Sequence, residues 1–314
     1  MRALVTGGAG FIGSHLVESL ASVGHEVRVI DDLSSGSLES ILPDVEVIGG
    51  SIADEATVRS ALRDVDVVFH QAAHRAVLRS VEHPLATDLA NTHGTLTLLK
   101  ECVDAGVSRL VFASSSSVYG GAETMPTPEA VRLNPRSPYA VSKLAGEHYS
   151  RVFAELYSLE TVALRYFNVY GPRQRPDSAY AAVIPLFVQA LIRGDQPIVH
   201  GDGHQSRDFT YIEDVVIANL AAVEAPSRIC SGKAYNIAGG SAHSLLDLLD
   251  ILGEIIGTEP NPTFGDPRPG DVRHTSADIS AARRDLGYRP RVGLKEGLLR
   301  TVEWFAEESR PTTV

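Results

Sequence analysis

The chain has 314 residues, which is too long for the commonest single-core domain and predicts one large α/β domain with a smaller appended lobe. Its 44% hydrophobic and 21% charged residues are typical of a globular protein, and no apolar run is long enough to span a membrane. The net charge of −11 argues against nucleic acid or an anionic membrane as the main partner. The short apolar segment at the N-terminus is interrupted by glycines and is unlike a signal peptide, so we expect a cytoplasmic protein. Cys102 and Cys230 lack the spacing of a disulfide or metal site, and no metal is expected.

The first thirteen residues combine an apolar run with regularly spaced glycines. Residues 3–5 are expected to form a buried strand, and Phe11 and Ile12 begin an amphipathic helix. The glycines are Gly7, Gly10 and Gly13. This spacing provides a tight turn, a close backbone approach to a ligand and close helix packing, and it directs helix N-terminal amides at a pyrophosphate. The alternative is a turn that only punctuates the structure, but the flanking strand and helix favour dinucleotide binding.

Two carboxylates follow the second expected strand, Glu26 to Ile30. Asp31 lies 18 residues past Gly13, about where a carboxylate binds the adenosine ribose of a dinucleotide, although it could instead cap the turn that follows. Asp31 and Asp32 would repel a 2′-phosphate, so NAD is favoured over NADP as the cofactor. Further cofactor contacts are expected after the next two strands, from Ser51, Ile52, Gln71, Ala72 and Ala73.

Strand-like and helical patterns alternate through the first half of the chain. Strands are expected at residues 46–48, 65–70, 110–114 and 161–167, with helices beginning at Glu55, Asn91 and Tyr139. The alternation predicts an α/β fold with a Rossmann-type, doubly wound parallel sheet, whose ligand cleft lies at the carboxyl ends of the strands. Pro- and Arg-rich segments after Gly171 indicate a smaller C-terminal substrate-binding lobe. We expect a cofactor-binding domain at 1–168 and the second lobe at 169–314, with returns to the first domain near 206–237.

Tyr139 and Lys143 lie four residues apart at the start of an expected helix, so their side chains share one face. There the Lys143 ammonium can lower the pKa of the Tyr139 phenol and prepare it as a general base. A serine run at 114–117 ends the preceding strand and would place a hydroxyl at the same crevice. A Tyr-x-x-x-Lys pair is common by chance and a serine run can bond to itself, so neither pattern is specific alone.

Ordered blocks along essentially the whole chain resemble the extended short-chain dehydrogenases/reductases, and among them the nucleotide-sugar 4-epimerases. The blocks are Thr6-Gly-Gly-Ala-Gly-Phe-Ile-Gly13, Phe69-His-Gln-Ala-Ala73, Ser115-Ser-Ser-Val-Tyr-Gly120, Tyr139-x-x-x-Lys143, Arg165-Tyr-Phe-Asn-Val-Tyr-Gly-Pro172, Gly201-Asp-Gly-x-Gln-x-Arg-Asp-Phe209 and Arg268-Pro-Gly-Asp271. Together they are far more specific than one glycine turn.

The resemblance implies an enzyme that uses NAD and a UDP-sugar. Ser115 and Tyr139 would act on the sugar 4-hydroxyl, and Lys143 would also hold the nicotinamide ribose. The other implied contacts are Tyr166 and Phe167 to the nicotinamide, Asn168 to the sugar diphosphate, and Ile184, Pro185, Arg207, Arg268 and Asp271 to the uridine diphosphate. By the same resemblance, C4 is oxidised to a ketone and then reduced on its other face, so the cofactor is regenerated.

Ser116 and Ser117 bear on which reaction is expected. Related dehydratases carry an Asp-Glu pair at these positions, and glucuronate decarboxylases carry a glutamate at the second, whereas hydroxyls cannot readily expel water, so 4-epimerisation is favoured. Arg175, helped by these two serines, is expected to recognise a C6 carboxylate, which makes conversion of UDP-glucuronic acid to UDP-galacturonic acid the first choice. The alternatives are an arginine that serves the diphosphate or loop packing, and UDP-glucose or UDP-N-acetylglucosamine as the substrate.

The sequence leaves two other classes of protein as alternatives and does not decide the oligomeric state. A net oxidoreductase of this fold would release NADH, and a non-catalytic NAD-binding protein should lack Tyr139 or Lys143. The resemblance also implies a homodimer through the helices beginning near Asn91 and Tyr139. Its shared bundle would contain Leu96, Leu99, Val103, Tyr149, Val152 and Phe153, although the same stripes also fit ordinary core faces.

Overall fold

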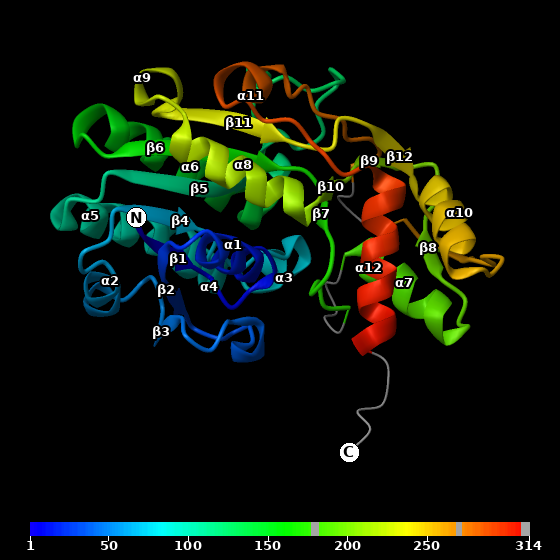
Figure 1. The fold of residues 1–314 in the computed structure, drawn as a ribbon. Helices are drawn as coiled ribbons and strands as arrows, with labels where there is room; N and C mark the ends of the chain where they lie inside the picture. The colour runs from blue at the N-terminus through cyan, green and yellow to red at the C-terminus, as the bar shows by residue number, and fades with distance from the viewer. Residues whose placement is uncertain (177–181, 268–271, 309–314) are drawn as a thin grey trace.

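A parallel sheet of seven strands forms the centre of the molecule (Figure 1). The structure is a computed structural model that describes residues 1–176, 182–267 and 272–308. The strand order is β11-β6-β5-β4-β1-β2-β3, and all neighbours pair in parallel. The strands are β1 (Arg2–Thr6), β2 (Glu26–Asp31), β3 (Glu46–Gly49), β4 (Val67–His70), β5 (Arg109–Ser115), β6 (Glu160–Tyr166) and β11 (Lys233–Ile237). The order proceeds outward from β1 in both directions, which confirms the predicted Rossmann-type, doubly wound fold.

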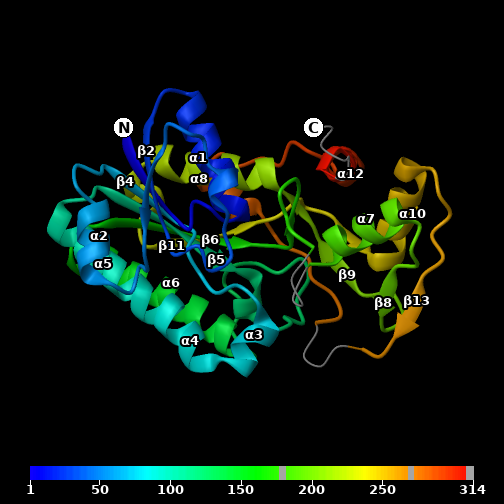
Figure 2. The ribbon, with the colours of Figure 1, turned by 90° about the horizontal axis from the view of Figure 1, so that it is seen from below.

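Helices cover both faces of this sheet, as Figure 2 shows. One face carries α1 (Phe11–Ser22) and α8 (Ile212–Glu224), and the other carries α2 (Glu55–Ala61), α5 (Gly94–Ala105) and α6 (Pro138–Leu156). Each face has its own apolar core, with Leu16 against the first and Leu98 against the second. Because the strands are buried on both sides, they are rich in apolar residues. None of the described helices is both long enough and apolar enough to cross a membrane.

The two helices that border the site differ in how well the sequence locates their starts. Ser137 caps α6, its hydroxyl accepting a hydrogen bond from the Ala140 amide, and Pro138 takes the first helical position, one residue before the predicted start. The helix expected from Asn91 begins earlier, because Pro84 opens a helical run. This run consists of α4 (Pro84–Asp88), a π-helical turn η2 (Leu89–His93) and α5, and it follows a separate short helix, α3 (Val77–Glu82).

The C-terminal half supplies a smaller lobe built from three packed helices and three two-stranded sheets. Its helices are α7 (Val183–Arg193), α10 (Leu245–Ile256) and α12 (Leu294–Glu308). The paired strands are β7 (Val169–Tyr170) with β10 (Thr210–Tyr211), β8 (Ile198–His200) with β13 (Thr263–Gly265), and β9 (Ser206–Asp208) with β12 (Ala242–Ser244). Both β9 and β10, at the start of the segment expected to return to the first domain, therefore lie outside the central sheet.

The chain returns from the second lobe to complete the first. Strand β11 pairs with β6 at the edge of the central sheet, and α8 packs against β5 and β6. Two short helices, α9 (Ser227–Cys230) and α11 (Ser280–Asp285), flank this edge (Figure 1). The domain boundary near residue 168 and the returns to the first domain near 206–237 both stay predictions.

Candidate active site

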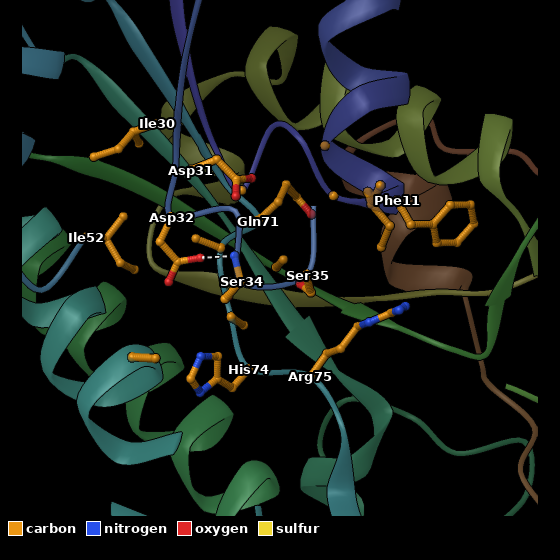
Figure 3. Close-up of a pocket in the computed structure, with 18 of the residues that line it drawn as sticks. Phe11, Ile30, Asp31, Asp32, Ser34, Ser35, Ile52, Gln71, His74 and Arg75 are labelled. Atoms are coloured by element: carbon orange, nitrogen blue, oxygen red, sulfur yellow. Dashed lines mark hydrogen bonds between the residues drawn. The ribbon is translucent and has the colours of Figure 1, made fainter. Parts of the chain in front are cut away.

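A cleft at the carboxyl ends of β1, β2, β4 and β5 gathers every residue predicted to contact the cofactor except Phe167, which lines a neighbouring cavity (Figure 3). They are Gly7, Gly10, Phe11, Ile12, Gly13, Asp31, Asp32, Ser51, Ile52, Gln71, Ala72, Ala73, Tyr139, Lys143 and Tyr166. Figure 3 shows Ile52 and His74 on the side of Asp32, whereas the Arg75 side chain points toward the side where Phe11 lies. Segments far apart in the sequence therefore form one elongated cleft.

The glycine turn leaves no space for side chains at two of its positions. A Cβ on Gly13 would lie 2.1 Å from the Gly7 carbonyl oxygen, and a Cβ on Gly7 would lie 2.7 Å from Cα of Ala72. Gly7 also has a φ of 68°, a conformation that other residues rarely adopt. The glycines thus let the chain pack closely where it enters α1, and Gly10 at the N-terminus of this helix lines the cleft, which suits a dinucleotide diphosphate.

Asp31 and Asp32 both face the cleft and both fix the loop after β2. The Asp31 carboxylate accepts hydrogen bonds from the Ala9 amide at 2.9 Å and the Leu33 amide at 2.8 Å, and burial raises its pKa. Asp32 accepts a hydrogen bond from the Ser34 amide at 2.9 Å. Asp31 therefore caps the turn, as the alternative interpretation expects, and it also lines the cleft; its contact with a ribose stays a prediction. Two acidic groups at this end of the cleft favour NAD over NADP.

A buried polar cluster below the cleft contains a residue that the sequence did not single out. Asn219 of α8 donates a 2.8 Å hydrogen bond to the Tyr166 hydroxyl and is within 3.2 Å of the Gln71 amide nitrogen. Burial raises the pKa of Tyr166 to about 12, so its hydroxyl stays protonated. Asn219 lies in an apolar helix 53 residues after Tyr166, and only tertiary packing reveals its role.

Tyr139, Lys143 and Ser115 meet where the cofactor cleft joins a second cavity. The Lys143 ammonium donates a 2.8 Å hydrogen bond to the Ala113 carbonyl and lies 6.0 Å from the centre of the Tyr139 ring. Burial lowers the pKa of Lys143 to about 7. Burial also raises the pKa of Tyr139, while a hydrogen bond from Ser115 and the positive charge of Arg75 oppose that rise. This arrangement can pass a proton between the phenol and a ligand hydroxyl.

The helix that carries this pair is anchored by a buried carboxylate, Glu147, which the sequence also did not single out. Its oxygens accept hydrogen bonds from the Ser114 hydroxyl at 2.5 Å and from two nitrogens of Arg165 at 2.9 and 2.7 Å. Arg165 continues to the Tyr119 hydroxyl at 2.8 Å, and that hydroxyl donates to Asn236 of β11 at 2.6 Å. The network therefore connects α6 with three strands of the sheet.

The second cavity, which we call the sugar cavity, brings together five of the ten predicted substrate residues. Those that line it are Ser115, Ser116, Ser117, Asn168 and Arg207, together with Tyr139. Asn168 has a φ of 34°, and its amide donates to the Asp208 carbonyl at 3.0 Å. Asn168 and Arg207 also line an adjoining cavity that Ile184 closes. Pro185 is buried and lines neither cavity, and Arg268 and Asp271 lie outside the described residues.

Arg175 does not line the sugar cavity with Ser116 and Ser117. It lines a separate, basic cavity that includes Arg75 and Arg79 and borders the glycine turn. The segment after β7 turns toward α1, where Arg173 donates hydrogen bonds to His15 and Glu18. The expected cooperation of Arg175 with the two serines is absent from this arrangement. Among the described residues, no cluster of metal-ligating side chains occurs.

The fold and the cleft define a dinucleotide-dependent enzyme with a tyrosine–lysine pair beside a second ligand cavity. Residues 3–238 match the NAD dependent epimerase/dehydratase family, and the chain belongs to that family. A UDP-glucose 4-epimerase from Mycolicibacterium smegmatis is 39% identical, over 99% of this chain and 100% of the relative.

Solved structures agree with the family. The UDP-glucose 4-epimerase of Thermotoga maritima, solved with UDP-glucose, is 39% identical with a TM-score of 0.95, covering 99% of this chain and 100% of that one. A UDP-glucuronic acid 4-epimerase from Bacillus cereus, solved with a fluorinated UDP-glucuronic acid and NAD, is 34% identical with a TM-score of 0.90, covering 98% and 100%. The protein is thus an NAD-dependent epimerase, an isomerase whose substrate is a UDP-sugar.

Proposed function

We propose that this protein inverts the configuration at C4 of a UDP-sugar, with Tyr139 as its acid–base group. Gly7, Gly10 and Asp31 would hold NAD in the cleft, where the cofactor would supply an acceptor and donor for the C4 hydride. Tyr139 takes the proton of the 4-hydroxyl and later gives it back, and Ser115 positions that hydroxyl. Lys143, when protonated, stabilises the ionised phenol, and it binds the nicotinamide ribose. The observation that carries the proposal is the meeting of Tyr139, Lys143 and Ser115 at the junction of the two cavities.

Epimerisation is favoured over dehydration or decarboxylation by the lining of the sugar cavity. Among its described lining residues there is no carboxylate, and Ser116 and Ser117 occupy the wall where an acid would stand. Elimination of water from the sugar needs a proton donor placed at the leaving hydroxyl. With only hydroxyls there, the 4-keto sugar is expected to take back its hydride instead.

UDP-glucuronic acid is the first substrate that we propose. In support, three arginines line the sugar cavity with the serines: Arg75, Arg136 and Arg207. A C6 carboxylate entering this cavity meets positive charge and hydroxyl donors, with no acidic group among the lining residues that the structure describes. The sequence-based proposal that Arg175 recognises the carboxylate is less well supported, because Arg175 lines a different cavity. UDP-glucose is the second candidate, since the relatives at 39% identity act on it by name.

Proton NMR of the purified protein tests both proposals. UDP-glucuronic acid, UDP-glucose and UDP-N-acetylglucosamine are incubated separately without added NAD, and the expected result is the 4-epimer of the preferred sugar. A 4,6-dehydrated product or released carbon dioxide would refute epimerisation. Tyr139→Phe should lower kcat by about 10²- to 10⁴-fold while NAD stays bound. Arg136→Ala should reduce the preference for UDP-glucuronic acid over UDP-glucose, and Arg175→Ala is the matched comparison.

We also propose a homodimer, but through a surface different from the predicted stripe. Leu99 is fully buried and Phe153 is 8% exposed, both within the core of their own chain. By contrast Leu85 is 85% exposed, Leu89 56% and Val141 53%, and α4 and η2 pack on α6. These side chains form an apolar strip that a second copy would cover. Light scattering during gel filtration should show a dimer that Leu85→Asp and Leu89→Asp dissociate.

The expected cytoplasmic location is likewise a proposal. It is supported by the use of NAD and by the two cysteines, which are buried and unpaired. Cell fractionation with an antibody to the native protein tests it, and recovery outside the cytoplasmic fraction would refute it.

A further inference from the structure

A further cavity, distinct from the sugar cavity and about 450 Å³ in volume, borders the cofactor cleft and extends beyond it. The two share one wall, which consists of Gly10, Phe11, Ser34, Ser35, Ala73, His74 and Arg75. The rest of this further cavity is lined by other segments: Ser37 and Ser40 after β2, Arg79 on α3, and Arg175 after β7. We call this space the basic cavity. Part of its volume is enclosed by residues that do not line the cofactor cleft.

Positive charge is concentrated in the basic cavity although the chain carries a net charge of −11. Four arginines and two histidines line it, and among its described lining residues there is no aspartate or glutamate. Arg173 is paired with Glu18 beside the cavity. Arg79 and Arg175 are in no ion pair with any residue that the structure describes. Cations that share one cavity repel each other, and a bound anion would remove that cost.

The cofactor diphosphate does not by itself explain Arg79 and Arg175. Its expected position is the N-terminus of α1, next to Gly10, where the shared wall already offers Arg75 and two serine hydroxyls. Arg79 and Arg175 line only the basic cavity. Guanidinium groups with nearby serine hydroxyls are the donors that phosphate oxygens pair with most strongly.

We propose that the basic cavity binds a second phosphate-bearing anion beside the bound NAD, with Arg79 and Arg175 pairing with its oxygens. Phe11 lines the basic cavity, the cofactor cleft and the sugar cavity, so an occupant of the basic cavity touches a wall of both other sites. An anion bound there therefore changes the affinity for NAD or the UDP-sugar, and each of those ligands changes the affinity for the anion by the same factor.

Calorimetric titration of inorganic pyrophosphate into the NAD-loaded protein tests the proposal. UDP is present at saturation, so that the substrate's own diphosphate site is filled. The expected result is one pyrophosphate per chain, with affinity reduced about tenfold or more by Arg79→Ala and by Arg175→Ala. Arg63→Ala is the matched control, because Arg63 is exposed and lies at the opposite, amino-terminal ends of the strands.

Three results would overturn the proposal. They are the absence of saturable binding to the wild-type protein, an equal loss of affinity in Arg63→Ala, and release of one NAD for each pyrophosphate bound, which would assign the arginines to the cofactor. Titrations with orthophosphate, ADP and glucose 1-phosphate then distinguish a free phosphate, a nucleotide and a sugar phosphate as the occupant. Epimerase activity of the same samples is measured separately, so failure of the proposed function and failure of the anion site are distinguishable.

Discussion

Replacing Glu147 by glutamine should lower both the stability and the turnover of this enzyme. Glu147 is 7% exposed and Arg165 5%, so the substitution leaves a guanidinium buried without its counter-charge. Losing one partner of a buried pair costs about 3–5 kcal/mol, and the retained amide oxygen places this variant near the lower value. With an unfolding entropy of about 2.1 cal/mol/K per residue over 314 residues, about 3 kcal/mol lowers the melting temperature by about 5 °C.

The effect on turnover follows from the position of Glu147, one helical turn beyond Lys143 on α6. Its bonds to Ser114 and Arg165 set α6 against β5 and β6, and a shift of about 1 Å at the reacting groups can cost about a hundredfold in rate. We therefore expect kcat to fall ten- to a hundredfold with little change in KM. The assays are calorimetric melting of the NAD-loaded protein and steady-state kinetics.

Glu101→Gln is the matched control, because Glu101 is a buried carboxylate on α5 that pairs with Arg59, far from the tyrosine. Arg59 is 62% exposed and can be hydrated again, so this variant should lose less stability and keep its full kcat. Equal melting temperatures for Glu147→Gln and the wild type, or equal kcat values for the two variants, would refute the positioning role of Glu147.

Three further predictions concern the cofactor cleft. Lys143 is neutral in the folded NAD-free protein above its pKa of about 7, but in the unfolded chain it stays charged up to about its ordinary pKa of 10.5. The free energy of unfolding of the wild type, relative to that of Lys143→Met, should therefore fall as the pH drops from about 10 to 7. Urea unfolding of both proteins checks this, and a difference that stays constant with pH would contradict it. Gly13→Ala forces a Cβ to within 2.1 Å of a carbonyl and should yield protein without NAD, as assayed after acid release of the nucleotide. Asn219→Leu leaves the buried Tyr166 hydroxyl without its best partner and should cost about 1–3 kcal/mol in urea unfolding; unchanged stability would show that water replaces the amide.

The sequence located the parts of the fold that depend on local pattern. Six strands of the central sheet, β1 to β6, lie within about two residues of the ranges predicted from their apolar runs. Gly7, Asp31, Tyr139 and Lys143 were found for a related reason, since each follows a strand or begins a helix at a characteristic spacing. In a parallel sheet those positions converge at one edge, whatever the loops between them do.

Residues whose roles depend on contacts between distant segments were not predictable in this way. Glu147 and Asn219 occupy helix positions where an acid or amide looks like an ordinary surface residue, and only the folded chain buries them against Arg165 and Tyr166. Arg175 was assigned to the sugar because it follows Asn168 closely in sequence. The segment between them turns back toward α1, so neighbours in sequence end in different cavities.

The late addition of β11 to the central sheet has a consequence for how the protein is made. The first 168 residues contain six of the seven strands, but the outer edge of β6 pairs only when residues 233–237 have left the ribosome. Until then β6, whose seven residues include Val162 and Leu164, presents an open apolar edge on which another chain can pair. Synthesis of the whole second lobe up to β11 therefore precedes closure of the sheet, and a fragment ending near residue 168 is expected to aggregate rather than to fold as an independent NAD-binding domain.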